Sequence, residues 1–138
     1  MCLSLVNFRS IMPSDGSDPN LDDAKKLVER EGFSLMVRRE FYMNPLALLK
    51  TRAGFYIVKL VASYDDGRND DEHFIAYDAP SGLLIDNDQN KKIIEVEDTD
   101  RSTKRKALLC FKDFFYNPVS TKITGVYELT LSAPVVKP

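Results

Sequence analysis

Three apolar runs between residues 55 and 86 constrain the fold of this chain more than any other feature. The first run, Phe55–Val61, is rich in β-branched and aromatic residues, a composition that is typical of a central strand. The other two runs, His73–Ala79 and Leu83–Asp86, flank a Pro-Ser-Gly turn at positions 80–82. Two apolar runs around such a turn predict a β-hairpin.

The turn of this hairpin decides which side chain lies beside His73, the one histidine of the sequence. If the turn has two central residues, Asp86 lies opposite Ile75 and becomes a diagonal neighbour of His73 on the same face. If the loop has three residues, Asn87 turns to the face of His73 instead. We expect Asp86 to orient the imidazole, with Asn87 as the second candidate.

The remaining patterns predict helices first and then mostly strands, with one helix inserted. Helices are expected over residues 2–11, 20–31, 46–50 and, with the clearest periodicity, 100–116, and strands over residues 33–37, 92–97 and 126–132. Asn44 and Pro45 are typical of a helix start. This order favours one α+β domain that spans residues 1–138.

Composition limits the classes of partner. The chain is 43% apolar and can bury a core, and its formal charge of −2 provides no overall field for nucleic acid or an anionic membrane. Two cysteines do not make a disulfide framework, and no apolar run approaches the length of a membrane span. The apolar run at the start of the sequence is too short for the hydrophobic region of a signal peptide. We therefore expect a cytoplasmic protein.

The residue inventory also limits the chemistry. Two cysteines and one histidine fall short of the four ligands of a structural zinc site, and no glycine-rich phosphate loop is present, so neither a metal nor an organic cofactor is expected. If His73 acts as a base, a thiol is the natural nucleophile, which leaves Cys2 and Cys110.

The two thiols have different surroundings in the sequence. Cys110 lies on the apolar stripe of the predicted helix 100–116, which indicates core packing. Cys2 begins a predicted helix, where backbone amides favour the thiolate. An ordinary apolar role for Cys2 at the chain terminus is equally compatible with the pattern.

The segment His73–Asn87 resembles the histidine hairpin of papain-like cysteine peptidases, most closely the Josephin-type and bacteriocin-processing branches. In those enzymes a histidine opens one strand and an acid or amide ends the next. Residues 2–7 resemble the helix that carries the nucleophile, and residues 44–58 resemble the helix and strand before the histidine. The resemblance covers roughly residues 2–90.

The resemblance implies a papain-like α+β fold with N-terminal helices packed on an antiparallel sheet. It also implies a thiol hydrolase that cleaves peptide or isopeptide bonds in a protein or peptide substrate. Cys2 would be the nucleophile, His73 the base and then the acid, and Asp86 or Asn87 the orienting residue.

One departure from that family keeps other interpretations open. Papain-like enzymes place an oxyanion-binding glutamine before the nucleophile, but here only Met1 precedes Cys2, and Gln89 is far downstream. The chain is then a fragment of a longer protein, a degenerate member, or a protein whose Met1 is removed to expose Cys2. The alternatives are an inactive papain-like domain that binds an extended peptide, and an unrelated α+β interaction module.

Two segments of the sequence are rich in charged residues. The acidic residues of loop 64–72 lack the spacing of a helix-loop-helix calcium site and predict a solvated loop. The basic residues at 101 and 104–106 face acidic residues at 95–100, which predicts local charge compensation rather than nucleic-acid binding.

Overall fold

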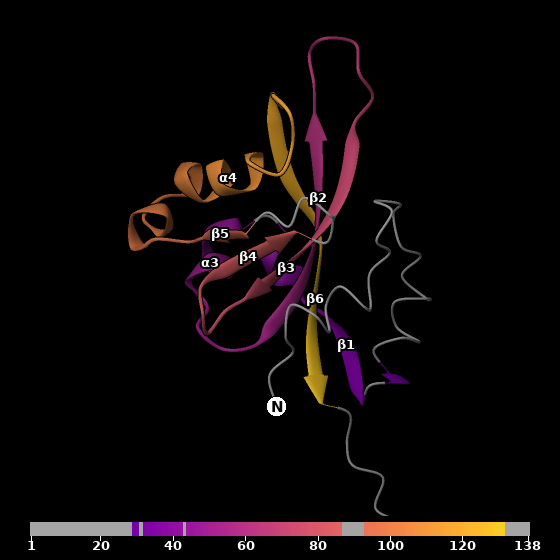
Figure 1. Cartoon of the computed structure of the whole chain (residues 1–138), viewed down its shortest axis with the longest axis vertical. Coiled ribbons are helices and arrows are strands. Elements are labelled where there is room, and N and C mark those ends of the chain that lie inside the picture. Colours follow the sequence, from indigo (N-terminus) through magenta and orange to yellow (C-terminus); the bar gives the residue numbers. More distant parts are fainter. Residues whose placement is uncertain (1–28, 31, 43, 87–92, 132–138) are drawn as a thin grey trace, which may run out of the picture.

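Among the described residues, the chain folds around a six-stranded antiparallel sheet (Figure 1). The computed structural model describes residues 29–30, 32–42, 44–86 and 93–131. The strands run in the order β1-β6-β2-β3-β4-β5 across the sheet. The strands are β1 Phe33–Val37, β2 Phe55–Ser63, β3 Asp71–Asp78, β4 Leu83–Asp86, β5 Ile93–Glu95 and β6 Ser120–Leu131. The α-helices are α3 Pro45–Lys50 and α4 Lys104–Lys112, and the 3-10 helices are η1 Arg39–Phe41 and η2 Asp98–Arg101.

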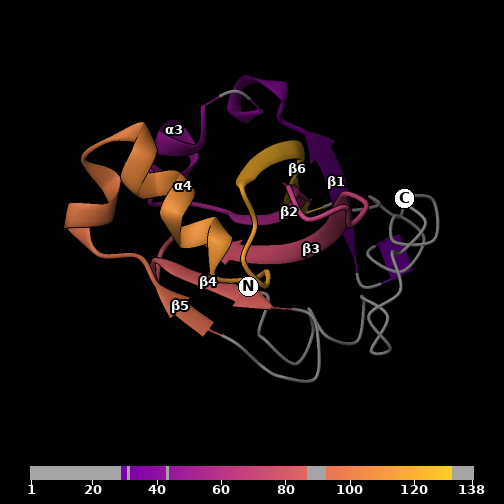
Figure 2. The same ribbon diagram turned by 90° about the horizontal axis from the view of Figure 1, so that it is seen from above.

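The two faces of the sheet carry separate apolar clusters. Strand β2 lies between β6 and β3, and seven of its nine residues are buried, as expected of a central strand. Helices α3 and α4 lie side by side on one face (Figure 2). There Leu48 and Phe111 are fully buried in one cluster with Ile75 and Tyr77 of β3. The second cluster consists of strand residues of the opposite face, such as Phe74 and Ile57. Alternation along the strands therefore decides which side chains face the helices.

Side-chain caps set where the two α-helices begin. The side chain of Asn44 accepts a hydrogen bond from the backbone N–H of Ala47, and Pro45 occupies the first turn of α3, as the sequence predicts. In α4 the hydroxyl of Thr103 accepts from the backbone N–H of Lys106 at 3.2 Å. None of the helices in the described ranges is long and apolar enough to cross a membrane.

The predicted fold class, papain-like α+β with N-terminal helices packed on the sheet, is wrong. The described part of the chain is mainly β, with α-helices of only six and nine residues in α3 and α4. The Thr103 cap starts α4 later than the apolar periodicity from residue 100 suggested. Strand β6 is also longer than predicted, with twelve residues, because it pairs with β2 back to Ser120. The helix expected over 2–11 lies outside the described residues, and so does the helix expected over 20–31 apart from residues 29 and 30, which are helical.

Candidate functional site

The hairpin of β3 and β4 has the two-residue turn. The backbone N–H of Gly82 donates to the carbonyl of Ala79 at 3.2 Å, and Asp78 pairs with Leu83. With this register Asp86 lies opposite Ile75, which confirms the pairing that the shorter turn predicted. Asp86 is consequently the diagonal neighbour of His73, which precedes Ile75 by two positions on β3.

The side chains of His73 and Asp86 are in direct contact. The Nε2 atom of His73 lies 2.6 Å from the Oδ1 atom of Asp86. The side chain of Asp86 is only 6% exposed, and that of His73 is 17% exposed, so the carboxylate is buried while the ring reaches solvent at one side. An ionised carboxylate only accepts hydrogen bonds, and this contact therefore places a hydrogen on Nε2.

Two neighbours fix the ring from other directions. Leu60 of β2 is the cross-strand partner of His73, and it is fully buried. The ring of Phe115, three residues beyond the end of α4, meets the imidazole edge-on, with centroids 6.0 Å apart and an interplanar angle of 75°. Phe115 was predicted only as part of the apolar stripe of a helix. No local signal relates it to His73, because the contact depends on how α4 packs over the sheet.

A histidine held in this way has the arrangement of a general acid–base group. With hydrogen on Nε2, Nδ1 carries the lone pair and is the basic nitrogen of the ring. A buried carboxylate at the opposite nitrogen fixes the tautomer and stabilises the imidazolium that forms when Nδ1 accepts a proton. The chemistry that this pair supports is proton transfer to and from a group beside His73.

The remaining predicted site residues are placed differently. Cys2 and Asn87 lie outside the described residues, as does Gln89. Cys110 is 6% exposed and belongs to the core between α4 and the sheet, with its Sγ 3.7 Å from the carbonyl oxygen of Lys106. Its burial confirms the core-packing role and leaves Cys2 as the candidate nucleophile.

Two ion pairs lie in and beside the acidic loop between β2 and β3. Arg68 donates to Asp66 at 2.7 Å and lies over the ring of Tyr64, 3.8 Å from its centroid. The hydrogen bond from Arg68 lowers the pKa of the Asp66 carboxyl below its usual value. Lys59 pairs with Glu72 at 3.3 Å. No group of three or more metal-ligating side chains occurs in the part of the chain that the structure describes.

The predicted charge compensation around α4 is confirmed at one position. Arg101 lies 3.4 Å from Asp98, as local compensation predicts. For Lys104, Arg105 and Lys106 no ion pair is formed with any described residue, and their compensation stays a prediction.

Comparison with known proteins adds no relative from which a role could be transferred. No protein-family model, no curated protein and no solved structure matches the chain.

Proposed function

We propose that the protein is a thiol hydrolase in which His73 and Asp86 form the acid–base pair and Cys2 supplies the nucleophile. The observation that carries this proposal is the 2.6 Å contact between a partly exposed imidazole and a buried carboxylate. The proposed substrate is a peptide or isopeptide bond in a protein or peptide. No metal ion and no organic cofactor is required.

The proposed reaction has two halves, in which a thioester first forms and is then hydrolysed. Nδ1 of His73 accepts the thiol proton, and the thiolate of Cys2 attacks the carbonyl carbon to form a C–S bond. The imidazolium then protonates the leaving amine as the C–N bond breaks, which leaves a thioester. Water then attacks the thioester carbonyl while His73 accepts a proton from it, and a C–O bond forms as the C–S bond breaks. The carboxylic acid product leaves, and His73 returns the proton to the thiolate of Cys2. Asp86 keeps the ring in one tautomer throughout.

The test compares the alkylation rates of the two thiols. Iodoacetamide labelling at mildly acidic pH, followed by peptide mass spectrometry, measures Cys2 and Cys110 in one sample. A thiol paired with an imidazole is expected to label much faster than the buried Cys110. His73→Ala is expected to abolish the difference, and Asp86→Asn to reduce it.

A matched control separates the effect of losing the contact that orients His73 from the effect of losing one negative charge. Asp78 lies on β3 at the other end of the same strand pair, so Asp78→Asn removes the same charge without touching His73. This variant is expected to label like the unmodified protein. Slow and equal labelling of both thiols contradicts the hydrolase proposal and favours the alternative of an interaction module.

A further inference from the structure

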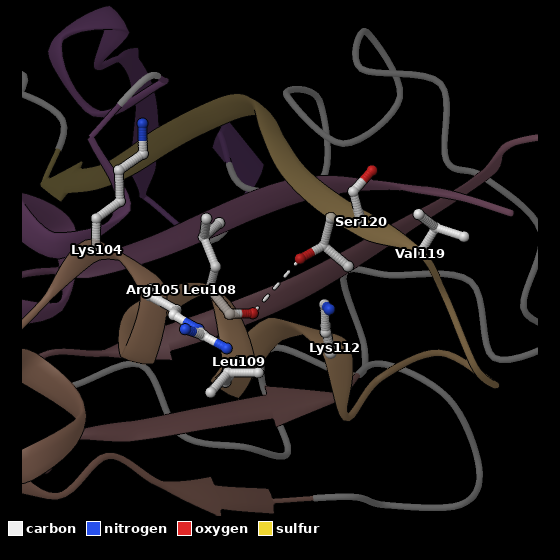
Figure 3. A pocket seen from close by; sticks show the side chains of 8 residues that line it. Lys104, Arg105, Leu108, Leu109, Lys112, Val119 and Ser120 are labelled. Atoms are coloured by element: carbon white, nitrogen blue, oxygen red, sulfur yellow. Dashed lines mark hydrogen bonds between the residues drawn. The ribbon is translucent and has the colours of Figure 1, made fainter.

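A groove runs between helix α4 and the start of strand β6, and neither His73 nor Asp86 lines it. Its volume is about 440 Å³. Leu108 forms part of its floor, with Lys104 and Lys112 on either side of it and Val119 across from the helix (Figure 3). Thr121 also lines the groove, and its hydroxyl donates to the carbonyl of Leu108 at 3.5 Å.

The apolar part of the groove is open to solvent. Leu109 is 50% exposed and Val119 is 52% exposed, and both line the groove. Exposed apolar side chains that share a concave surface with charged ones are typical of a protein-binding patch.

The rim of the groove is basic and carries no acid. Lys104, Arg105 and Lys112 line it, and none of them has an ion-pair partner within the described ranges. The first turn of α4 contains no acidic residue, although the N-terminus of a helix favours negative charge. Basic side chains at this end oppose the helix dipole, so helix stability alone does not account for them.

From this combination of charge and apolar surface, we infer that the groove binds an acidic segment of a partner protein that also carries apolar side chains. Its carboxylates would meet the basic rim, and an apolar side chain would rest on Leu109 and Val119. A nucleic acid fits less well, because its affinity grows with the number of phosphates neutralised, and here three cations surround an apolar floor in a chain of net charge −2. This binding role is independent of the proposed hydrolase.

The test measures peptide binding by fluorescence anisotropy. The probe is a fluorescein-labelled peptide of alternating glutamate and leucine, and the controls are peptides of alternating glutamate and serine and of alternating lysine and leucine. The first peptide is expected to bind saturably and more weakly as salt is added. The serine peptide is expected to bind about ten-fold more weakly, and the lysine peptide not to bind.

Two neighbouring residues of α4 provide a matched pair of variants. Arg105 lines the groove, whereas Lys106 is exposed on the same helix but does not line it. Arg105→Glu is expected to weaken binding of the glutamate–leucine peptide about ten-fold, and Lys106→Glu to leave it nearly unchanged. Both variants add an acid to the first turn, so neither is expected to destabilise the helix.

A third variant tests the apolar contact. Leu109→Ser changes a half-exposed side chain and is expected to weaken binding while the melting temperature stays nearly the same. Absence of saturable binding by the glutamate–leucine peptide overturns the proposal, as do equal effects of Arg105→Glu and Lys106→Glu. Binding of anionic vesicles or single-stranded RNA through Arg105, with no binding of the peptide, also overturns it.

Discussion

Replacement of Gly82 by alanine tests the turn that places Asp86 beside His73. Gly82 has a backbone φ of +67°, in the left-handed region that side chains with a Cβ disfavour. A Cβ at this position would lie 2.7 Å from the Nη2 atom of Arg101, which is closer than two such atoms approach. The substitution therefore strains the backbone and displaces a buried side chain.

The two effects give the expected loss of stability. A residue other than glycine in the left-handed region costs about 1–2 kcal/mol. Overpacking at a buried site adds about 1–3 kcal/mol, and the lower end applies here because the obstacle is the end of a flexible side chain, Arg101. Gly82→Ala is thus expected to lower the free energy of unfolding by about 2–3 kcal/mol.

Urea unfolding followed by far-ultraviolet circular dichroism measures this loss in a chain without tryptophan. Gly67 is the matched control, because its φ is +88° and an added Cβ would meet nothing within 4 Å. Gly67→Ala is expected to lose only the backbone part, about 1–2 kcal/mol. In an Arg101→Ala background, Gly82→Ala is expected to lose only that part as well. Equal losses of stability for Gly82→Ala and Gly67→Ala would refute this reasoning. So would a loss for Gly82→Ala that is as large in the Arg101→Ala background as in the unmodified protein.

Two further predictions concern the core. Phe111 is fully buried between α4 and the sheet, so Phe111→Ala is expected to lower the free energy of unfolding by about 3–5 kcal/mol, whereas Leu109→Ala on the exposed face of α4 is expected to change it by about 0.5 kcal/mol or less. Similar losses in urea unfolding would contradict the placement of α4. Burial raises the pKa of the Tyr77 hydroxyl above its ordinary value of 10.0. The stability that the neutral hydroxyl contributes is therefore complete below pH 10.0 and is lost as the pH rises above 10.0. Urea unfolding is expected to show a smaller alkaline loss in Tyr77→Phe, and an unchanged loss would contradict this assignment.

The sequence predicted those parts of the fold that depend on neighbouring residues. Alternation left two hairpin registers open, one for each turn length, and the expected one holds in the pairing of Ile75 with Asp86. The start of α3 followed from Asn44 and Pro45, whose roles are local. The contact of His73 with Asp86 was predictable for the same reason, since both residues belong to one hairpin.

The parts that were missed depend on distant contacts. Residues 120–125 include Lys122, Thr124 and Gly125 and carry no alternating apolar pattern, yet they extend β6 because β2 supplies the hydrogen-bonding partners. Phe115 reaches His73 only because α4 crosses the sheet at that point. The predicted fold class failed because helical periodicity is visible in the sequence, whereas the long-range strand pairing that dominates the described residues leaves no local signal.

The central claim is that Asp86 holds the imidazole of His73 with hydrogen on Nε2 and the lone pair on Nδ1. The chain has one histidine, so its two ring nitrogens give unambiguous signals in a ¹H–¹⁵N spectrum that uses long-range couplings. At a pH where the ring is neutral, Nε2 is expected to show the shift of a protonated nitrogen and Nδ1 that of an unprotonated one, and Asp86→Asn is expected to alter this preference. Hydrogen on Nδ1, or a spectrum that Asp86→Asn leaves unchanged, would contradict the account.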